Sequence, residues 1–187
     1  MKKLDKNFSL EKYGLKVRLV NENDAEFILS LRSDLNRTKY MMPLDGEIES
    51  QRRWIQDYKK REKEGLDYYF IYSDNEGKRI GLNRLSHIDY NAKSGKASSW
   101  IAIEGLKYEP VIMVLLGNEI AFNLIGVDTT WGELHKDNSS AYKILKLFGY
   151  KLKDVGTEYL KSSLLQSDFF SASENSILLN RIKAISR

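Results

Sequence analysis

The stretch "HKDNSSAYKILKLFGYK", from His135 to Lys151, contains the boundary signals of a complete helix. Asn138 is a favoured N-cap residue, because its side-chain oxygen can accept a hydrogen bond from a backbone N–H one turn further on. Apolar residues follow at the spacing of a buried helical stripe: Ala141, Ile144, Leu145 and Phe148. Gly149 suits the left-handed position after the helix, and Tyr150 the apolar contact that accompanies such a cap. The stretch therefore predicts a short amphipathic helix that begins at Asn138.

A strand and an apolar helix precede this stretch. In "VDTTWGELHK", residues 127–136, alternation places Trp131, Glu133 and His135 on one face and Thr130, Gly132 and Leu134 on the other. The helix before it runs from Pro110 to Leu124 and ends at Gly126. Because a helical crossover joins parallel strands, we expect "SSWIAIEG", residues 98–105, to lie beside "VDTTWGELHK" in one sheet.

Outward from this core, strands alternate with helices along most of the chain. The predicted strands outside the core are residues 15–21, 67–74, 78–90, 150–156 and 157–166, and the second strand of a hairpin runs over 96–105. The predicted helices are one that starts at Asn23 or Asp24, one over 48–64 that ends at Gly65, and one over 174–185, while "SDFF" is expected to form a short turn. A loop is expected around Pro43. This order predicts an α+β fold: a mixed, mostly antiparallel sheet of about seven strands with helices on both faces.

Composition narrows the possible functions. The chain has 187 residues, which fits one domain. It contains no cysteine, which excludes disulfides and a cysteine nucleophile and suits a reducing cytoplasm; its two histidines are too few to predict a metal site. The longest apolar run, residues 110–116, is too short for a membrane span. A net charge of +4 permits an anionic ligand, and the basic segment "RRWIQDYKKREKEG" also carries acidic residues. We expect neither nucleic acid nor a membrane as partner.

Several motifs together resemble the GNAT acyltransferases, in the branch that includes ribosomal-protein and amino-sugar N-acetyltransferases. These motifs are "LVNENDAEFILSLRSD" with its Arg32, "SQRRWIQDY", the hairpin "RIGLNRLSHIDYNAKSGKASSWIA", and a late helix–strand–helix with Asn138, Ala141, Gly149 and Tyr150 at the family's spacing. The resemblance covers residues 15–164 and leaves 165–187 as a C-terminal helical extension of the single domain 1–187. It implies the GNAT fold, with the strands 98–105 and 127–136 splayed apart at their C-terminal ends.

The resemblance also implies a reaction and a co-substrate. Such enzymes transfer the acetyl group of acetyl-CoA to an amine, here of an amino sugar or other small molecule, or of a protein, by a monomer or homodimer. The residues expected to hold acetyl-CoA are Trp100, Ile101, Ala102, Ile103, Lys107, Asn138 and Ala141. For Asn138 two roles remain open: helix capping alone, or capping together with contact to the pantetheine arm.

Three residues are candidates for catalysis. The family's base often lies five residues before the asparagine, which is Glu133 here; the alternative is a strand carboxylate that faces solvent or pairs with a lysine. His135 shares that face and either relays protons or is a loop histidine. The family's thiolate-protonating tyrosine falls at Leu145, which cannot donate. Tyr142 is the nearest hydroxyl in sequence, and it is either that acid or simply an exposed or packed side chain.

The loop from Glu104 to Pro110 departs from the family pattern. The glycines that let backbone N–H groups surround the CoA pyrophosphate fall at Leu106, Tyr108 and Pro110. Lys107 is the one cation there, against Glu104 and Glu109. We therefore expect a poor phosphate site and weak acetyl-CoA binding. The alternative function is a catalytically degraded GNAT-fold protein that serves as a binding or interaction module.

Overall fold

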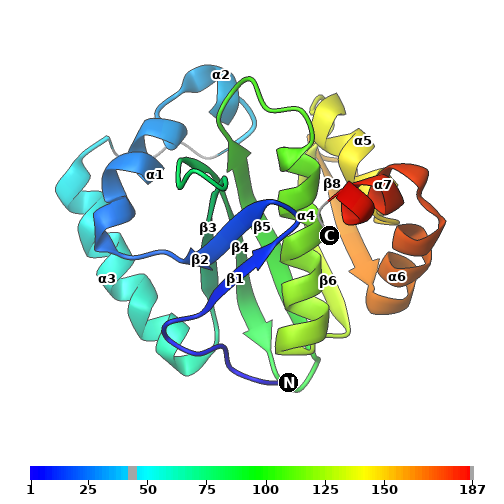
Figure 1. Ribbon diagram of the computed structural model, residues 1–187, viewed down its shortest axis with the longest axis horizontal. Coiled ribbons are helices and arrows are strands. Elements are labelled where there is room, and N and C mark those ends of the chain that lie inside the picture. The colour runs from blue at the N-terminus through cyan, green and yellow to red at the C-terminus, as the bar shows by residue number, and fades with distance from the viewer. Residues whose placement is uncertain (42–45, 186–187) are drawn as a thin grey trace.

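The computed structural model describes residues 1–41 and 46–185, which form one mixed sheet with helices on both faces (Figure 1). The strands are β1 (Ser9–Lys12), β2 (Leu15–Leu19), β3 (Tyr68–Ser73), β4 (Arg79–Asp89), β5 (Ser94–Ala102), β6 (Thr129–His135), β7 (Lys151–Asp154) and β8 (Tyr159–Leu165). They lie in the order β1-β2-β3-β4-β5-β6-β8-β7. Among the described residues, β5 and β6 are the only strands that pair in parallel, so the predicted mixed, mostly antiparallel sheet is confirmed.

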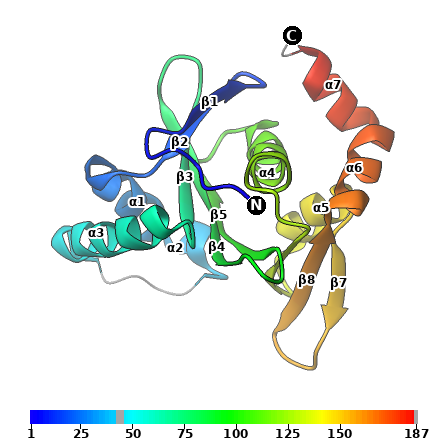
Figure 2. The same ribbon diagram turned by 90° about the horizontal axis from the view of Figure 1, so that it is seen from below.

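The helices divide between the two faces of the sheet. They are α1 (Ala25–Arg32), α2 (Leu35–Thr38), α3 (Ile48–Glu64), α4 (Glu109–Glu119), α5 (Ser139–Leu147), α6 (Gln166–Asn175) and α7 (Ile177–Ile185), with a 3-10 turn at Glu22–Asp24 and a π-helical continuation of α4 over Ile120–Ile125. Figure 2 shows α1 and α3 on one face and α4 on the other. Each face has its own cluster of buried apolar residues, and α5, α6 and α7 contribute to the cluster on the α4 side.

Several boundaries follow the sequence signals. α3 runs from Ile48 to Glu64 and ends at Gly65, whose φ of 80° is the left-handed conformation expected of a helix-terminating glycine. α5 begins after Asn138, whose side chain accepts a hydrogen bond from Ala141 N at 3.1 Å, and Gly149 follows it with φ 85°. These three predictions are confirmed.

Other predictions were wrong or incomplete. The sheet has eight strands rather than about seven, because the sequence of β1, "SLEK", lies at an exposed edge and lacks an alternating pattern. "SDFF" lies in α6 rather than in a turn, since Phe169 packs on Phe122 and Phe148. Asp24, one of the two predicted residues, is the N-cap of α1, but its side chain forms no cap hydrogen bond with that helix; Asn21 caps the 3-10 turn that precedes it. The loop predicted around Pro43 lies outside the described residues.

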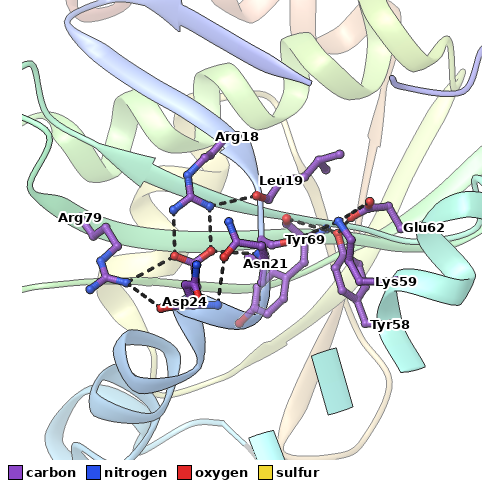
Figure 3. A network of polar contacts seen from close by, with 11 residues as sticks. Arg18, Leu19, Asn21, Asp24, Tyr58, Lys59, Glu62, Tyr69 and Arg79 are labelled. Carbon is purple, nitrogen blue, oxygen red and sulfur yellow. Dashed lines mark hydrogen bonds and ion pairs between the residues drawn. The ribbon is translucent and has the colours of Figure 1, made fainter. Parts of the chain in front are cut away.

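Two polar networks fix α1 and α3 on the sheet (Figure 3). Asp24 accepts hydrogen bonds from Arg18, Arg79 and the backbone of Asn21, and so joins the start of α1 to β2 and β4. In α3, Tyr58 donates to Glu62, and its hydroxyl oxygen accepts from Tyr69 N of β3 at 2.9 Å. The start of α1 and the C-terminal half of α3 are therefore joined to the sheet, which holds these two helices in place on one face.

Candidate active site

The parallel strands β5 and β6 are paired over only part of their length. Their ladder joins Ser94–Lys96 to Thr129–Trp131 and then stops, although both strands continue. Gly132 lies just past this point, and a Cβ atom there would lie 2.7 Å from Ala97 O, so only glycine permits this approach. The strands therefore separate from the Gly132 level onward, and the prediction of adjacent, splayed parallel strands is confirmed.

β5 also contains a bulge opposite β4. Arg84 pairs with Ser98 and Leu82 with Ile101, so Ser99 and Trp100 together oppose Asn83. Ser99 has a φ of 53°, a left-handed conformation that is strained for a residue with a side chain. A bulge leaves backbone groups without a ladder partner. Such groups beside the β5–β6 gap can bind a carbonyl oxygen.

A cavity of about 210 Å³ fills the gap between the two strands and continues under the sheet; we call it the interstrand cleft. Its lining includes Ala97 and Thr130, close to where the ladder stops, and Asn118 of α4. It also includes Trp100 of β5 and Asn138 at the start of α5. A ligand in this cleft lies between the two separated strands.

A second cavity of about 600 Å³ lies on the other face, against α1 and α3; we call it the helix-side pocket. Among the described residues its charged lining side chains are Arg32, Arg84, Lys96 and Glu133. Tyr40, Met41, Arg84, Ala97, Ser98, Ser99 and Glu133 line both cavities. The two cavities thus meet at the β5 bulge, where a ligand in one can contact a ligand in the other.

The helix-side pocket is predominantly cationic. Arg84 is held by Asp67 and lies over the ring of Trp54 at 5.1 Å. Burial lowers the pKa of Arg84, but its hydrogen bonds to Asp67 outweigh that effect and leave the pKa above its usual value. Burial lowers the pKa of Arg32. With three cations and one carboxylate in its described lining, the pocket favours a ligand that carries negative charge.

Glu133 occupies the junction of the two cavities. Its side chain is 51% exposed and forms an ion pair with Lys96 across the sheet, with Nζ and Oε2 3.0 Å apart. Glu133 therefore has the contacts expected of the alternative role, a strand carboxylate that pairs with a lysine. The location also suits a base, because an amine in the helix-side pocket can reach this carboxylate.

His135 is fixed in one orientation. Its ring stacks on Tyr40 with the ring centroids 4.6 Å apart, and Nδ1 accepts a hydrogen bond from Asp137 N at 3.2 Å. Since Nδ1 is an acceptor in that contact, the proton of the neutral ring lies on Nε2. His135 lines the interstrand cleft and can act there as a hydrogen-bond donor; in this tautomer it cannot accept a proton at Nε2.

The predicted residues of α5 separate into two groups. Asn138 and Ala141 line the interstrand cleft, as does Leu145, the position of the family's acid. Tyr142 does not line it: the residue is 41% exposed on the outer side of the helix. The structure therefore brings Asn138 and Ala141 to the cleft and leaves Tyr142 outside it.

Of the four residues proposed on β5 and after it, one lies in the cleft. Trp100 lines it, and its buried Nε1 has no acceptor among the residues that the structure describes. Ile101 belongs to the core on the α1 and α3 side. Ala102 accepts a hydrogen bond at its carbonyl from Arg37 at 2.9 Å, and Ile103 N donates to Ile80 O at 2.9 Å. Ile101, Ala102 and Ile103 are not part of the lining.

The loop before α4 is closed by one of its own side chains. The Glu109 carboxylate accepts hydrogen bonds from Lys107 N at 2.9 Å and from Tyr108 N at 3.0 Å. These are the backbone groups that an anion at this helix start would need. The Lys107 side chain is exposed. This contact is a second reason to expect a poor phosphate site, and the glycine positions alone did not reveal it.

Sequence reasoning missed Asn118, Arg84 and Tyr40. A signal existed for Asn118, which is the one amide in the apolar segment "EPVIMVLLGNEIAF". Arg84 and Tyr40 gave no signal, because their place in the site depends on a bulge and on a ring stack between distant segments.

Two classes of feature are absent from the described chain. Over residues 1–41 and 46–185, no group of three His, Cys, Asp or Glu side chains could hold a metal ion. No helix within those ranges combines the length and apolar character needed to cross a bilayer.

Comparison with known proteins places this geometry in context. The family model "Acetyltransferase (GNAT) domain" matches residues 15–151. Apo FdhC, a nucleotide-linked sugar GNAT, is 33% identical with a TM-score of 0.81, over 90% of this chain and 96% of that one. Ribosomal-protein-S5-alanine acetyltransferase from Vibrio fischeri is 18% identical with a TM-score of 0.71, over 87% of this chain and 99% of that one. Spermidine N-acetyltransferase from Vibrio cholerae, in complex with CoA and spermine, is 17% identical with a TM-score of 0.72, over 84% of this chain and 98% of that one. No curated protein matches the sequence.

Proposed function

Because the chain belongs to the GNAT acetyltransferase family, we propose that it transfers an acyl group from acetyl-CoA to the amine of a nucleotide-linked amino sugar. The observation that carries this proposal is the meeting of the two cavities at the β5 bulge beside Glu133. A thioester in the interstrand cleft and an amine in the helix-side pocket can come into contact only there. The lack of cysteine in the sequence fits action in a reducing cytoplasm.

The interstrand cleft has features that fit the pantetheine arm of CoA. Trp100 Nε1 is a buried donor without a partner among the described residues, and Asn138 presents a side-chain amide that its capping bond uses only at the oxygen. Pantetheine carries amide carbonyls that accept such bonds. We assign Trp100, Asn138 and Ala141 to this arm, and Lys107 to the phosphates as a point charge.

The transfer requires a neutral amine, which attacks the thioester carbonyl. The C–N bond forms, the C–S bond breaks, and the proton lost by the amine is matched by one gained by the CoA thiolate. Glu133 is the group that can take the proton from the amine, since it lines both cavities where they meet. His135 Nε2–H can orient the acceptor by donating a hydrogen bond.

Two observations support a nucleotide-linked amino sugar as the acceptor: the charge of the helix-side pocket and the similarity of this chain to a known sugar GNAT. The described lining of the helix-side pocket carries three cations and one carboxylate, which opposes a polyamine and favours a diphosphate. The 33% identical relative is a nucleotide-linked sugar GNAT. Trp54 and Tyr69 line this pocket as well and give it an aromatic wall beside the cations.

A direct test measures release of the CoA thiol by the purified protein with acetyl-CoA and a panel of amines. We expect turnover with nucleotide-linked amino sugars and at least tenfold lower kcat/KM with the corresponding free amino sugars and with spermidine. Equal or higher kcat/KM for spermidine would contradict the acceptor assignment. Absence of both acetyl-CoA binding and turnover would instead support the interaction-module alternative.

Replacing Glu109 by alanine is expected to strengthen acetyl-CoA binding about tenfold, or about 1.4 kcal/mol. The change frees Lys107 N and Tyr108 N for the pyrophosphate and removes a negative charge from its site. Isothermal calorimetry measures the effect. Glu104→Ala removes a charge from the same loop without freeing those N–H groups, and we expect a smaller gain. If both variants bind acetyl-CoA as the parent protein does, the phosphates do not approach this loop.

A further inference from the structure

The site suits one part of CoA better than the other. The interstrand cleft offers the pantetheine arm two groups, the buried Nε1 of Trp100 and the amide of Asn138. The nucleotide end needs free backbone N–H groups at the start of α4, and those of Lys107 and Tyr108 already donate to Glu109. A donor that carries a pantetheine arm without a nucleotide has no need of this loop.

Three segments meet at the C-terminal ends of β5 and β6, where these strands have separated: α2, the loop between β5 and α4, and α5 (Figure 1). Arg37 of α2 donates to Ala102 O at 2.9 Å and forms an ion pair with Glu104 of the loop at 3.4 Å. Tyr40 donates to Asp137 O, just before α5, at 3.1 Å. These contacts join the three segments into one continuous surface.

Each of the three segments exposes a large apolar side chain. Leu35 of α2 is 83% exposed, Tyr108 of the loop is 54% exposed, and Tyr142 of α5 is exposed as well. Tyr142 lies one helical turn after Asn138, so it borders the residues of α5 that line the cleft. Exposed apolar side chains on adjacent segments, with charged residues around them, are typical of a surface that binds another protein.

The same segments carry four exposed lysines that form no ion pair among the residues that the structure describes: Lys39, Lys107, Lys143 and Lys146. Most of the carboxylates nearby are engaged, since Asp34 and Glu104 pair with Arg37 and Glu109 is bound to its own loop. Asp137 lies 3.9 Å from the His135 ring. We call the four lysines and the three exposed apolar side chains the cationic face. Its charge favours an acidic partner.

We propose that the cationic face docks an acidic carrier protein, which presents the acyl group on a serine-linked phosphopantetheine and is a second donor for the reaction. The inference rests on the proposed acyl transfer and adds a protein partner to it. The arm enters the interstrand cleft as that of CoA does. Its single phosphate needs one cation, for which Lys107 is placed, and not the N–H groups that Glu109 occupies. The acyl group moves from the sulfur of the arm to the amine nitrogen, and the amine proton ends on that sulfur.

The test compares three donors on the complete chain, with a nucleotide-linked amino sugar as acceptor: acetyl-CoA, acetyl-phosphopantetheine and an acetylated acyl carrier protein of fatty-acid synthesis. We expect similar kcat/KM for the first two, because the loop before α4 does not hold the nucleotide, and at least tenfold higher kcat/KM for the carrier protein. Added salt should remove most of that advantage, since it screens the charges on both proteins. Acetyl-CoA at least tenfold above acetyl-phosphopantetheine, or a carrier protein no better than either, would overturn the proposal.

A binding measurement separates this inference from the proposed function. Calorimetry without acceptor should detect a complex with the phosphopantetheinylated carrier protein, and a weaker one with the carrier protein that lacks the arm. No complex with either form would overturn the partner, even where acetyl-CoA is turned over. A complex without turnover of any donor would support the partner and refute the proposed acyl transfer.

Charge reversal tests the face itself. The double variant Lys143→Glu, Lys146→Glu should lower kcat/KM for the acetylated carrier protein at least tenfold relative to that for acetyl-phosphopantetheine, because it turns an attraction into a repulsion. The matched control is Lys3→Glu, Lys6→Glu, which changes two exposed lysines of the N-terminal segment, at the other end of the molecule (Figure 1), and should retain the ratio. A ratio that the first double variant leaves unchanged would contradict docking at this face.

Discussion

Glu133→Gln is expected to lower the turnover number of acyl transfer about a hundredfold or more, the usual scale for loss of a positioned base. Glutamine keeps the shape of the side chain but cannot take a proton from the amine. Acetyl-CoA affinity should barely change, because the residues assigned to the pantetheine arm are Trp100, Asn138 and Ala141, and Glu133 lies at the junction of the two cavities. Steady-state kinetics and calorimetry on the same preparation measure both quantities.

The control for this variant is Glu158→Gln, an exposed carboxylate that lines neither cavity and should leave turnover unaffected. Unreduced turnover in Glu133→Gln would assign Glu133 to its ion pair with Lys96 alone. A parallel loss of acetyl-CoA affinity would show that the carboxylate organises the cleft instead of moving a proton.

Asp24→Ala should lower the free energy of unfolding by about 3 kcal/mol at neutral pH. Asp24 is 1% exposed and accepts two hydrogen bonds from Arg18, at 2.7 and 2.8 Å, together with bonds from Asn21 N and Arg79. Its removal leaves two arginines facing a cavity and uncaps the first turn before α1. Urea unfolding measures the loss. Asp57→Ala, which breaks an exposed ion pair with Lys60, is the control and should leave the free energy of unfolding nearly unchanged.

The same network gives a pH dependence of known sign. Burial acts to raise the pKa of Asp24, but its hydrogen bonds from Arg18 and from the backbone of Asn21 outweigh burial and leave the pKa below its usual value. A lowered folded-state pKa contributes stability above the unfolded pKa, near 3.9, and that stability is lost as pH falls through the folded value. The difference in stability between the parent protein and Asp24→Ala should therefore shrink in acid. A difference that grows in acid would contradict the assignment.

The parts of the fold that depend on local sequence signals could be predicted from the sequence. Asn138, Gly149 and Gly65 mark helix ends through their own backbone preferences, and the alternation around Glu133 shows which side chains share a face. β1 and α6 escaped prediction because they depend on contacts with distant segments: β1 pairs with β2, and α6 buries Phe169 on Phe122.

Less of the candidate site than of the fold could be predicted from the sequence. Spacing predicted Glu133, His135, Asn138 and Ala141, and all four line the interstrand cleft. It could not show that Glu133 pairs with Lys96, that Nδ1 of His135 accepts a backbone bond, or that Glu109 folds back onto its own loop. Each of these depends on where a flexible side chain settles among neighbours that are not adjacent in the sequence.

The helical walls of the two cavities come from different helices, although strand residues such as Ser98 and Glu133 line both. The helix-side pocket takes Ile28, Arg32, Gln51 and Trp54 from α1 and α3, while the interstrand cleft takes residues from α2, α4 and α5. Mutations on α1 and α3 can thus alter which acceptor is chosen and spare the donor, and the reverse holds for mutations on α4 and α5. A protein divided in this way can evolve new pairings of donor and acceptor by changing one partner at a time.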